Sequence, residues 1–123
     1  MKRDTSVYRW LLDAKVRELL RALHSRGRIA MEYSAEEIEQ AVLKGEREFA
    51  MLAIDRDTQL LREVRSAVAR IADGSFGICE ECDVEIPNRR LQAVPWARRC
   101  IICQEAADRR AEHSSFRVFP FAA

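Results

Sequence analysis

Residues 74–104 read GSFGICEECDVEIPNRRLQAVPWARRCIICQ and contain all four cysteines of the chain. These form two C-x-x-C pairs, Cys79 with Cys82 and Cys100 with Cys103, separated by seventeen residues. This spacing falls within that of four-cysteine zinc sites, because a two-residue gap lets both sulfurs of a pair reach one ion at ~2.3 Å. Two pairs complete a tetrahedron and leave no open position for a catalytic water. The stretch therefore predicts one structural Zn²⁺.

Roles for the cysteines apart from zinc binding fit the pattern less well. A redox C-x-x-C pair stands at a helix N-terminus after a strand, and neither pair has that context. Four unligated buried cysteines would not be expected at paired spacing. An iron or iron–sulfur site uses similar ligands and remains the alternative metal centre. The two histidines, His24 and His113, are far from both pairs in the sequence and are predicted to lie on the surface.

Outward from the cysteines, two stretches repeat apolar residues at steps of four, three and four, which is the a/d seam of a coiled coil. The seam residues are Leu12, Val16, Leu19 and Leu23 in the first stretch, and Leu60, Val64, Ala67 and Ile71 in the second. Residues 36–72 contain no proline and only Gly45, so we predict one continuous helix of about 55 Å. Two seams joined by a short connection indicate an antiparallel helical hairpin.

Local signals place the helix ends. The first helix is expected to reach about residue 32, with Gly27 tolerated inside it at ~1 kcal/mol. Ser34 and Glu37 form a capping box that starts the second helix near Ala35. Gly74 is suited to a left-handed cap after the helix ends.

The predicted fold is mainly α: an antiparallel two-helix coiled-coil hairpin, a small four-cysteine zinc-finger globule and a short C-terminal helix at residues 104–112. Its units are residues 1–73 for the hairpin with a tip near 33–41, residues 74–112 for the zinc-finger module, and residues 113–123 for a tail. The sequence leaves open whether the tail, with its three phenylalanines, docks on the hairpin base. Trp10 and Trp96 are interpreted as packing residues.

Composition narrows the function classes. Of 123 residues, 48% are hydrophobic and 33% are charged, which is typical of a folded, helix-rich chain. No apolar run approaches a membrane span, and the N-terminus lacks the features of a secretory signal, so we expect a cytoplasmic protein. The net charge of +1 gives no global field for nucleic acid. Residues 1–28 carry a net +5 and residues 36–48 a net −3, which favours an oriented protein partner.

One pattern resembles a known family. It comprises residues 73–82 (DGSFGICEEC), then Ile86, Arg89-Arg90-Leu91, Ala93, Pro95, Cys100 and Cys103-Gln104. It resembles the DksA/TraR family of bacterial zinc-finger regulators. The resemblance implies a two-helix coiled coil beside a four-cysteine zinc globule. It also implies direct binding to RNA polymerase, with the coiled coil entering the secondary channel to alter promoter complexes, and no reading of DNA sequence.

The resemblance also assigns a tip. The family carries D-x-x-D-x-A there, and the matching stretch here is Glu36-Glu37-Ile38-Glu39-Gln40-Ala41. Charge and the terminal Ala41 are kept, whereas Glu36 and Glu39 replace both aspartates. The extra methylene moves each carboxylate by about an ångström or more, and such contacts depend on geometry. Acids in a first helical turn are also favoured by the helix dipole whatever the function.

Two further expectations follow from the resemblance. Asp55 and Arg56 match a D-R pair of the family, which makes Arg56 a candidate polymerase contact; the alternative is an ordinary exposed helix charge. Some members respond to the alarmone ppGpp through basic residues, and the corresponding positions here are Glu63, Val94 and Gln104. None of the three is basic, so we do not predict ppGpp dependence.

The leading hypothesis is therefore a regulator that binds RNA polymerase through its secondary channel. The alternative is a zinc-stapled helical adaptor for another protein. A DNA-binding zinc ribbon is disfavoured by the near-neutral charge of residues 75–103. We do not expect an enzyme, because the sequence shows no nucleophile–base constellation and no open metal site.

Overall fold

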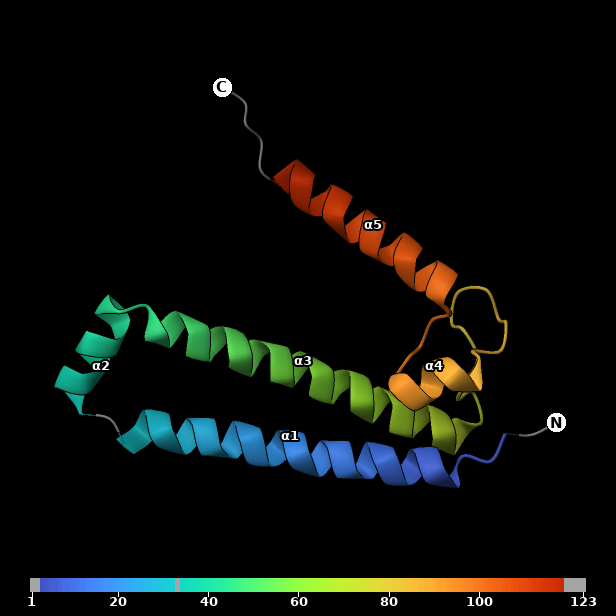
Figure 1. The fold of residues 1–123 in the computed structure, drawn as a ribbon, viewed down its shortest axis with the longest axis horizontal. Coiled ribbons are helices and arrows are strands. Elements are labelled where there is room, and N and C mark those ends of the chain that lie inside the picture. The colour runs from blue at the N-terminus through green and yellow to red at the C-terminus, as the bar shows by residue number, and fades with distance from the viewer. Residues whose placement is uncertain (1–2, 33, 119–123) are drawn as a thin grey trace.

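The computed structural model describes the backbone of residues 3–32 and 34–118, with all their side chains except those of residues 28–32, 41–42, 46–47 and 115–118. Its helices are α1 (Ser6–Glu32), α2 (Ala35–Leu43), α3 (Glu46–Asp73), α4 (Asn88–Ala93) and α5 (Ile101–Val118). Helices α1 and α3 lie side by side and antiparallel, and α2 joins them at one end (Figure 1). The cysteine loops and α4 lie at the other end, from which α5 departs. The predicted hairpin with a small globule at its base is confirmed.

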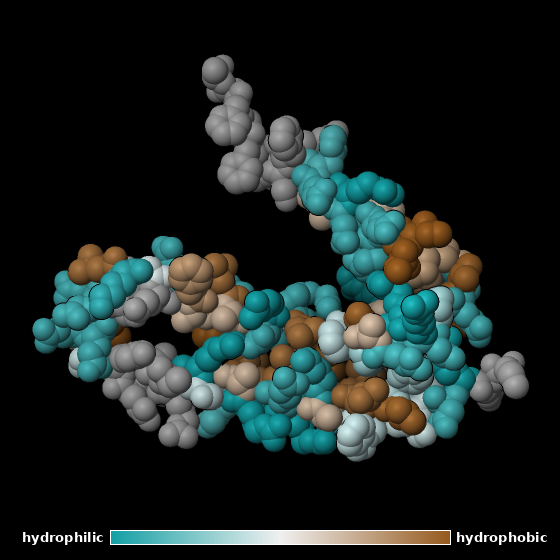
Figure 2. Space-filling model, in the orientation of Figure 1, coloured by the Kyte–Doolittle hydropathy of each residue, from teal (hydrophilic) through white to brown (hydrophobic). Residues whose placement is uncertain are grey.

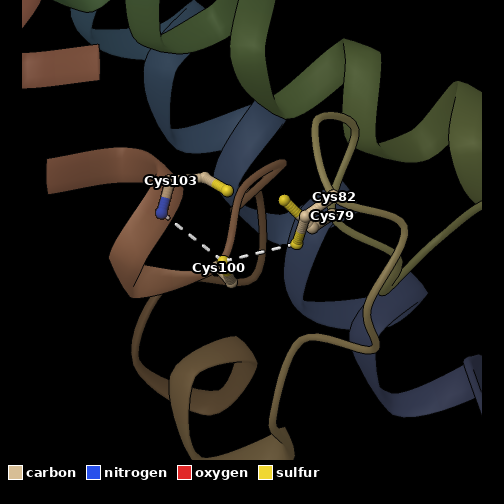
Figure 3. A group of neighbouring side chains, drawn as sticks. All are labelled: Cys79, Cys82, Cys100 and Cys103. Carbon is tan, nitrogen blue, oxygen red and sulfur yellow. Dashed lines mark hydrogen bonds between the residues drawn. The ribbon is translucent and has the colours of Figure 1, made fainter. Parts of the chain in front are cut away.

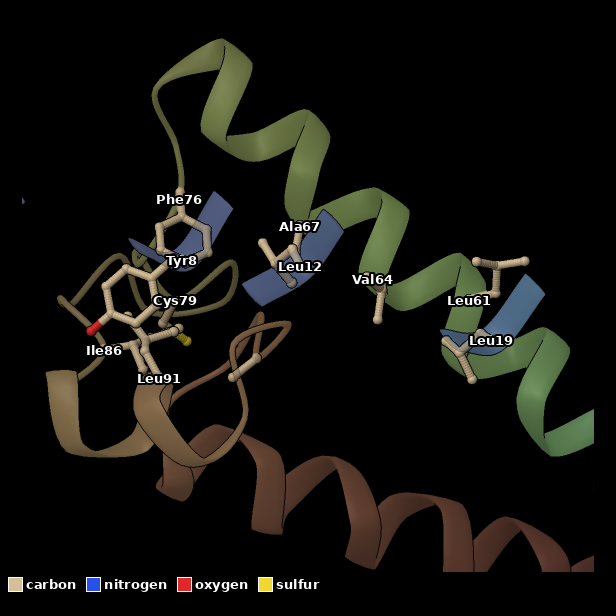
Figure 4. Packing of buried hydrophobic residues seen from close by; sticks show 11 residues of the cluster. Tyr8, Leu12, Leu19, Leu61, Val64, Ala67, Phe76, Cys79, Ile86 and Leu91 are labelled. Carbon is tan, nitrogen blue, oxygen red and sulfur yellow. The ribbon is translucent and has the colours of Figure 1, made fainter. Parts of the chain in front are cut away.

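The predicted seams form the hairpin interface. Leu12, Leu19, Val64 and Ala67 are buried between α1 and α3 (Figure 4). The other four seam residues are partly buried against them. A polar pair lies in the same interface further along, where the Arg26 guanidinium meets the buried Asp57 carboxylate. This pair lies between the base and α2, and it requires one register of the two helices because a buried charge without its partner is costly.

The caps also follow the prediction. Helix α1 runs through Gly27 to Glu32. The Ser34 backbone N–H donates to Glu37 Oε2 at 3.0 Å, and the Glu37 N–H donates to Ser34 Oγ at 3.2 Å, which is the expected capping box. Gly74 has a φ of 84° and its N–H donates to the Arg70 carbonyl, which ends α3.

The single helix predicted for residues 36–72 is wrong at Gly45. This residue has a φ of 74°, so the helix stops after Leu43 and α3 starts afresh at Glu46. Glycine adopts the left-handed region without the steric cost that a Cβ brings. The long arm is therefore α3 alone, about 42 Å for its 28 residues, and α2 forms the end of the hairpin instead of extending it.

The base of the hairpin shares one core with the cysteine loops. Tyr8 and Leu12 of α1 pack with Phe76, Ile86 and Leu91, and the rings of Tyr8 and Phe76 are 5.4 Å apart between centroids (Figure 4). This joint core ties the globule to the hairpin.

The N-terminal arm and the two tryptophans complete the base. Arg3 reaches over it and donates from Nη2 to the Ile86 carbonyl at 2.6 Å. Trp96 is partly buried against the core, with the Lys15 ammonium 5.8 Å from the centre of its ring. The packing role predicted for Trp10 is wrong, because this side chain is 65% exposed.

The C-terminal helix is longer than predicted. It begins at Ile101 instead of residue 104 and continues to Val118, so the predicted boundary at residue 113 falls inside it. Its early start has a local cause, because the Gln104 N–H donates to the Cys100 carbonyl and the second cysteine pair forms its first turn. The rest of the predicted tail, residues 119–123, lies outside the described residues.

None of the helices in residues 3–32 and 34–118 combines the length and the apolar character that a membrane crossing requires.

Two glycine substitutions should change stability in opposite directions. Gly77 has a φ of 83°, and a Cβ there would collide with the Arg3 guanidinium. We expect Gly77→Ala to lower the free energy of unfolding by about 1–3 kcal/mol. Gly27 is helical and has open space around it, so Gly27→Ala should raise that free energy by ~0.5–1 kcal/mol. Urea unfolding of the zinc-loaded protein measures both; a loss of stability in both variants would contradict the assignment.

Candidate metal centre

The four cysteines converge from two segments. Cys79 and Cys82 lie in the loop after α3, Cys100 immediately precedes α5, and Cys103 lies in the first turn of α5. We call the first pair knuckle 1 and the second pair knuckle 2. All four Sγ atoms lie within 4.8 Å of one another (Figure 3). The predicted ligand set is thus brought together by the fold.

The spacing of the sulfurs fits a tetrahedral zinc ion. Zn–S bonds of about 2.3 Å place the corners of such a tetrahedron ~3.8 Å apart. The Sγ atoms of Cys82 and Cys100, which come from different knuckles, are 3.8 Å apart. Cys79 is fully buried, whereas Cys82 is exposed. The ion would therefore lie between the shared core and the surface.

Backbone hydrogen bonds shape knuckle 1. The Cys79 N–H donates to the Val84 carbonyl at 2.9 Å, and the Asp83 N–H donates back to the Cys79 carbonyl at 3.0 Å. Asp83 adopts a φ of 60°, which turns the chain sharply after Cys82. The Ile86 N–H then donates to the Gly77 carbonyl at 2.7 Å, next to an antiparallel bridge between Ile78 and Glu85. This small ribbon holds both sulfurs on one side of the loop.

The two knuckles are also joined without metal. The Glu80 N–H donates to the Arg98 carbonyl at 2.9 Å. The side chain of Arg99, only 17% exposed, bridges the carboxylates of Glu80 at 3.2 Å and Glu81 at 3.1 Å. Within knuckle 2, the Cys103 N–H points to the Cys100 sulfur at 3.5 Å. These contacts hold the two knuckles next to each other in the folded globule.

The pKa values of the Cys79 and Cys103 thiols differ because the two side chains make different hydrogen bonds. Burial raises the pKa of Cys79, but hydrogen bonds from the backbones of Cys100, Cys82 and Glu81 outweigh it and lower that pKa to about 6. Hydrogen bonding to the Cys100 thiol raises the pKa of Cys103 far above its usual value. The pKa values of these two thiols are therefore shifted in opposite directions. Metal binding requires deprotonated cysteines, so the affinity of the site for zinc depends on pH.

The predicted tip residues lie at the opposite end of the hairpin. Glu36 and Glu39 are exposed on α2, whereas the Glu37 carboxylate is engaged in the capping box. Ala41 belongs to α2, but its side chain is outside the described part of the structure. Arg56 is exposed on α3. The fold thus separates Glu36 and Glu39 from the metal centre by the length of the hairpin, whereas Arg56 lies partway along α3.

One feature near the metal centre was not found from the sequence. Glu63, Val94 and Gln104, the positions considered for ppGpp, line one cavity of about 450 Å³ between α3 and the globule. Five arginines from three separate segments also line it: Arg62, Arg70, Arg90, Arg98 and Arg99. Burial lowers the pKa of Arg70, which remains a cation at neutral pH. No local motif signals this cluster, because only the tertiary fold assembles it.

Comparison with known proteins agrees with this architecture. Residues 74–109 match the family described as the prokaryotic dksA/traR C4-type zinc finger. The chain is 41% identical over 56 residues to the RNA polymerase-binding transcription factor DksA of Escherichia coli, which covers 46% of this chain and 37% of that protein. It is 47% identical over 51 residues to an uncharacterized protein of Aquifex aeolicus, covering 42% and 35% of the two chains. The matches thus span about a third of the length of these relatives.

A solved structure extends the likeness to the hairpin. Transcription factor DksA2 from Pseudomonas aeruginosa superimposes with a TM-score of 0.72 and 28% identity, over 89% of this chain and 86% of that one. Fold and cysteine cluster together define a helical-hairpin protein with a C4-type structural zinc site. The chain thus carries a zinc finger of the DksA/TraR type, in residues 74–109, within a fold similar to that of DksA2.

Removing the metal should unfold the globule before the hairpin. Structural zinc contributes folding free energy of order 10 kcal/mol. After chelation, or in Cys103→Ser, we expect the amides of Cys79 and Ile86 to lose protection from hydrogen exchange. The amide of Val64, in the hairpin interface, should keep most of its protection. Elemental analysis should find one zinc per chain; unchanged protection of the globule without metal would contradict this role.

Proposed function

We propose that this protein is a non-enzymatic transcription regulator that binds RNA polymerase and inserts its α2 end into the secondary channel. The observation that carries the proposal is the placement of two exposed carboxylates, Glu36 and Glu39, on α2, at the end of the hairpin remote from the zinc module. The DksA relatives are named as RNA polymerase-binding transcription factors, which supports the same partner here. Such a partner implies action in the cytoplasm.

The hairpin has the mechanical properties that the proposal needs. Helix α1 is about 40 Å long for its 27 residues, and α3 is of similar length. Their continuous apolar seam and the Arg26–Asp57 pair resist bending and sliding. A stiff rod of this size transmits the position of its base to its end, so the zinc module and the α2 end can act as two separate contacts.

At the tip, the negative charges of Glu36 and Glu39 would interact with the partner. Glu36 and Glu39 are three residues apart, so their carboxylates lie on the same side of α2. Exposed carboxylates attract basic groups and metal-bound groups, and either would serve as a target near a nucleotide-handling centre. In this proposal Glu36 and Glu39 supply the negative charges that two aspartates supply in the family's tip motif. Ala41 corresponds to the alanine that ends that motif.

Arg56 is proposed as a contact along the side of the rod. It is exposed, and it precedes Asp57, the residue that pairs with Arg26 inside the hairpin. The paired neighbour fixes the rotation of α3, so it also fixes the direction of Arg56. A fixed arginine is suited to bidentate recognition of a carboxylate on the partner.

In this proposal the chain divides into units as the sequence indicates: residues 1–73 insert, the tip lies near 33–41, and residues 74–112 anchor. Reading of DNA sequence has no part in it. A zinc-stapled adaptor for a different protein partner is the competing function. Binding to purified bacterial polymerase decides between the two, because an adaptor for another protein would give none at micromolar concentration.

The side contact is tested by charge removal. We expect Arg56→Ala to weaken binding to purified polymerase about tenfold, equivalent to ~1.4 kcal/mol, because it removes one charge-assisted contact. Arg65→Ala removes an exposed arginine from another face of the same helix and serves as the matched control. Equal affinities of both variants and the parent would exclude Arg56 from the contact.

The tip is tested separately from binding. The double variant Glu36→Ala/Glu39→Ala should keep the parent's affinity for polymerase and its stability, but change transcript yield from a responsive promoter in vitro. Glu105→Ala/Glu112→Ala removes the same charge from exposed positions on α5 and should leave the yield unchanged. If both double variants give the parent's yield, Glu36 and Glu39 only start a helix.

A further inference from the structure

Helix α5 lacks the packing that the other long helices have. Within the described residues, α3 packs along α1 and against α2, whereas α5 packs against no other helix to a comparable extent. It leaves knuckle 2 and diverges from α3, so that its C-terminal end stands over the half of α3 nearer to α2 (Figure 1). Helical stability in proteins comes mainly from the packing of a face, so an 18-residue helix with one anchored end is only marginally stable. It therefore gains from a second attachment.

An exposed apolar patch lies on α3 below the end of α5. The side chains of Phe49 and Leu52 are 77% and 65% exposed and are three residues apart, so they adjoin on the helix surface. We call these two residues the α3 patch. Figure 2 shows hydrophobic surface on the upper side of α3 toward α2, facing the open space under α5. Two large apolar side chains left this exposed favour a contact that covers them.

The seven-residue repeat of the hairpin shows which way the patch faces. Phe49 is seven and fourteen residues from Arg56 and Glu63, and Leu52 is seven and fourteen residues from Gln59 and Ser66. Residues a multiple of seven apart share one side of a coiled-coil helix. Gln59, Glu63 and Ser66 line the cavity under knuckle 2, together with Gln104 of α5. The α3 patch is therefore on the side of α3 from which α5 rises.

The two helices also match in length. Ser66 of α3 and Gln104 of α5 line the same cavity, so they serve as a common reference point from which to measure along each helix. From there, fourteen residues of α3 lead back to Leu52, and fourteen residues of α5 lead on to Val118. Each stretch is about 21 Å long at ~1.5 Å per residue. The end of α5 therefore comes level with the α3 patch.

We propose that residues 119–123, Phe119-Pro120-Phe121-Ala122-Ala123, fold back and dock on the α3 patch of the same chain. These residues follow α5 directly, and five extended residues reach up to about 17 Å. Two phenylalanine rings supply the apolar area that the patch lacks. Held this close, the segment is at millimolar effective concentration, which favours it over a second copy.

One exposed ion pair links α5 to knuckle 1. Arg110 of α5 donates to Glu81 of knuckle 1 at 3.2 Å, and the two side chains are 65% and 33% exposed. An exposed ion pair of this kind contributes ~0–1 kcal/mol, less than the burial of one phenylalanine side chain. Arg56 shares its side of α3 with Phe49, so a docked segment would lie beside the proposed polymerase contact. That consequence rests on the proposed function, whereas the docking does not.

The test is a contact measurement on the zinc-loaded full chain without polymerase. Leucine methyl groups and phenylalanine rings are labelled for nuclear magnetic resonance. We expect nuclear Overhauser effects between the Leu52 methyls and the rings of Phe119 or Phe121. The Leu52 methyl signals should also shift upfield relative to the double variant Phe119→Ala/Phe121→Ala, in which the contacts disappear. Ile102→Ala removes an exposed apolar side chain at the other end of α5 and should retain them.

Two results would overturn the proposal. One is a parent protein whose Leu52 methyl signals match those of the double variant, with no contact to either ring. The other is a contact seen in a mixture of singly labelled chains, one carrying labelled leucine and the other labelled phenylalanine. That result would assign the patch to a second copy of the chain. Neither result depends on polymerase, so the proposed function stands or falls separately.

Discussion

The closure of four cysteine sulfurs around one metal ion is the constraint on which the remaining structure depends. Residues 75–100 contain one short helix and a single bridge, which do not bury enough apolar surface to hold them folded. Tying the two knuckles together fixes Phe76, Ile86 and Leu91 beneath α1, where they continue the hairpin core. The Glu80–Arg98 backbone bond and the Arg99 ion pairs keep the knuckles adjacent. The same constraint starts α5, because Cys103 lies in its first turn.

The hairpin places two chemically different regions at its opposite ends. The four-cysteine site packs against the core through the buried Cys79, whereas the side chains of Glu36 and Glu39 on α2 are exposed. The break at Gly45 matters here, because it turns α2 into an end piece whose orientation is independent of the α3 axis. The distance between base and tip is set by α3 alone.

The comparisons with known proteins match the zinc module and the hairpin in different ways. The family model matches residues 74–109, the zinc module, where the cysteines and the turn residues are constrained by the geometry of the site. The hairpin is matched through its fold, and a seam of this kind accepts many apolar side chains of suitable volume. Helix α2 carries the exposed side chains of Glu36 and Glu39, and α3 carries the exposed Phe49–Leu52 pair.

The sequence alone determined the metal ligands, both seams, the capping box at Ser34 and the end of α3 at Gly74, because each depends on residues close together in the chain. It did not determine the break at Gly45, since glycine is tolerated within helices, as Gly27 in α1 shows. It also misjudged the packing of Trp10, which depends on distant contacts, and the two ends of α5. The arginine cavity and the position of α5 over α3 emerge only when the knuckles meet. Tertiary structure alone decided these features because separations of tens of residues leave no local periodic signal.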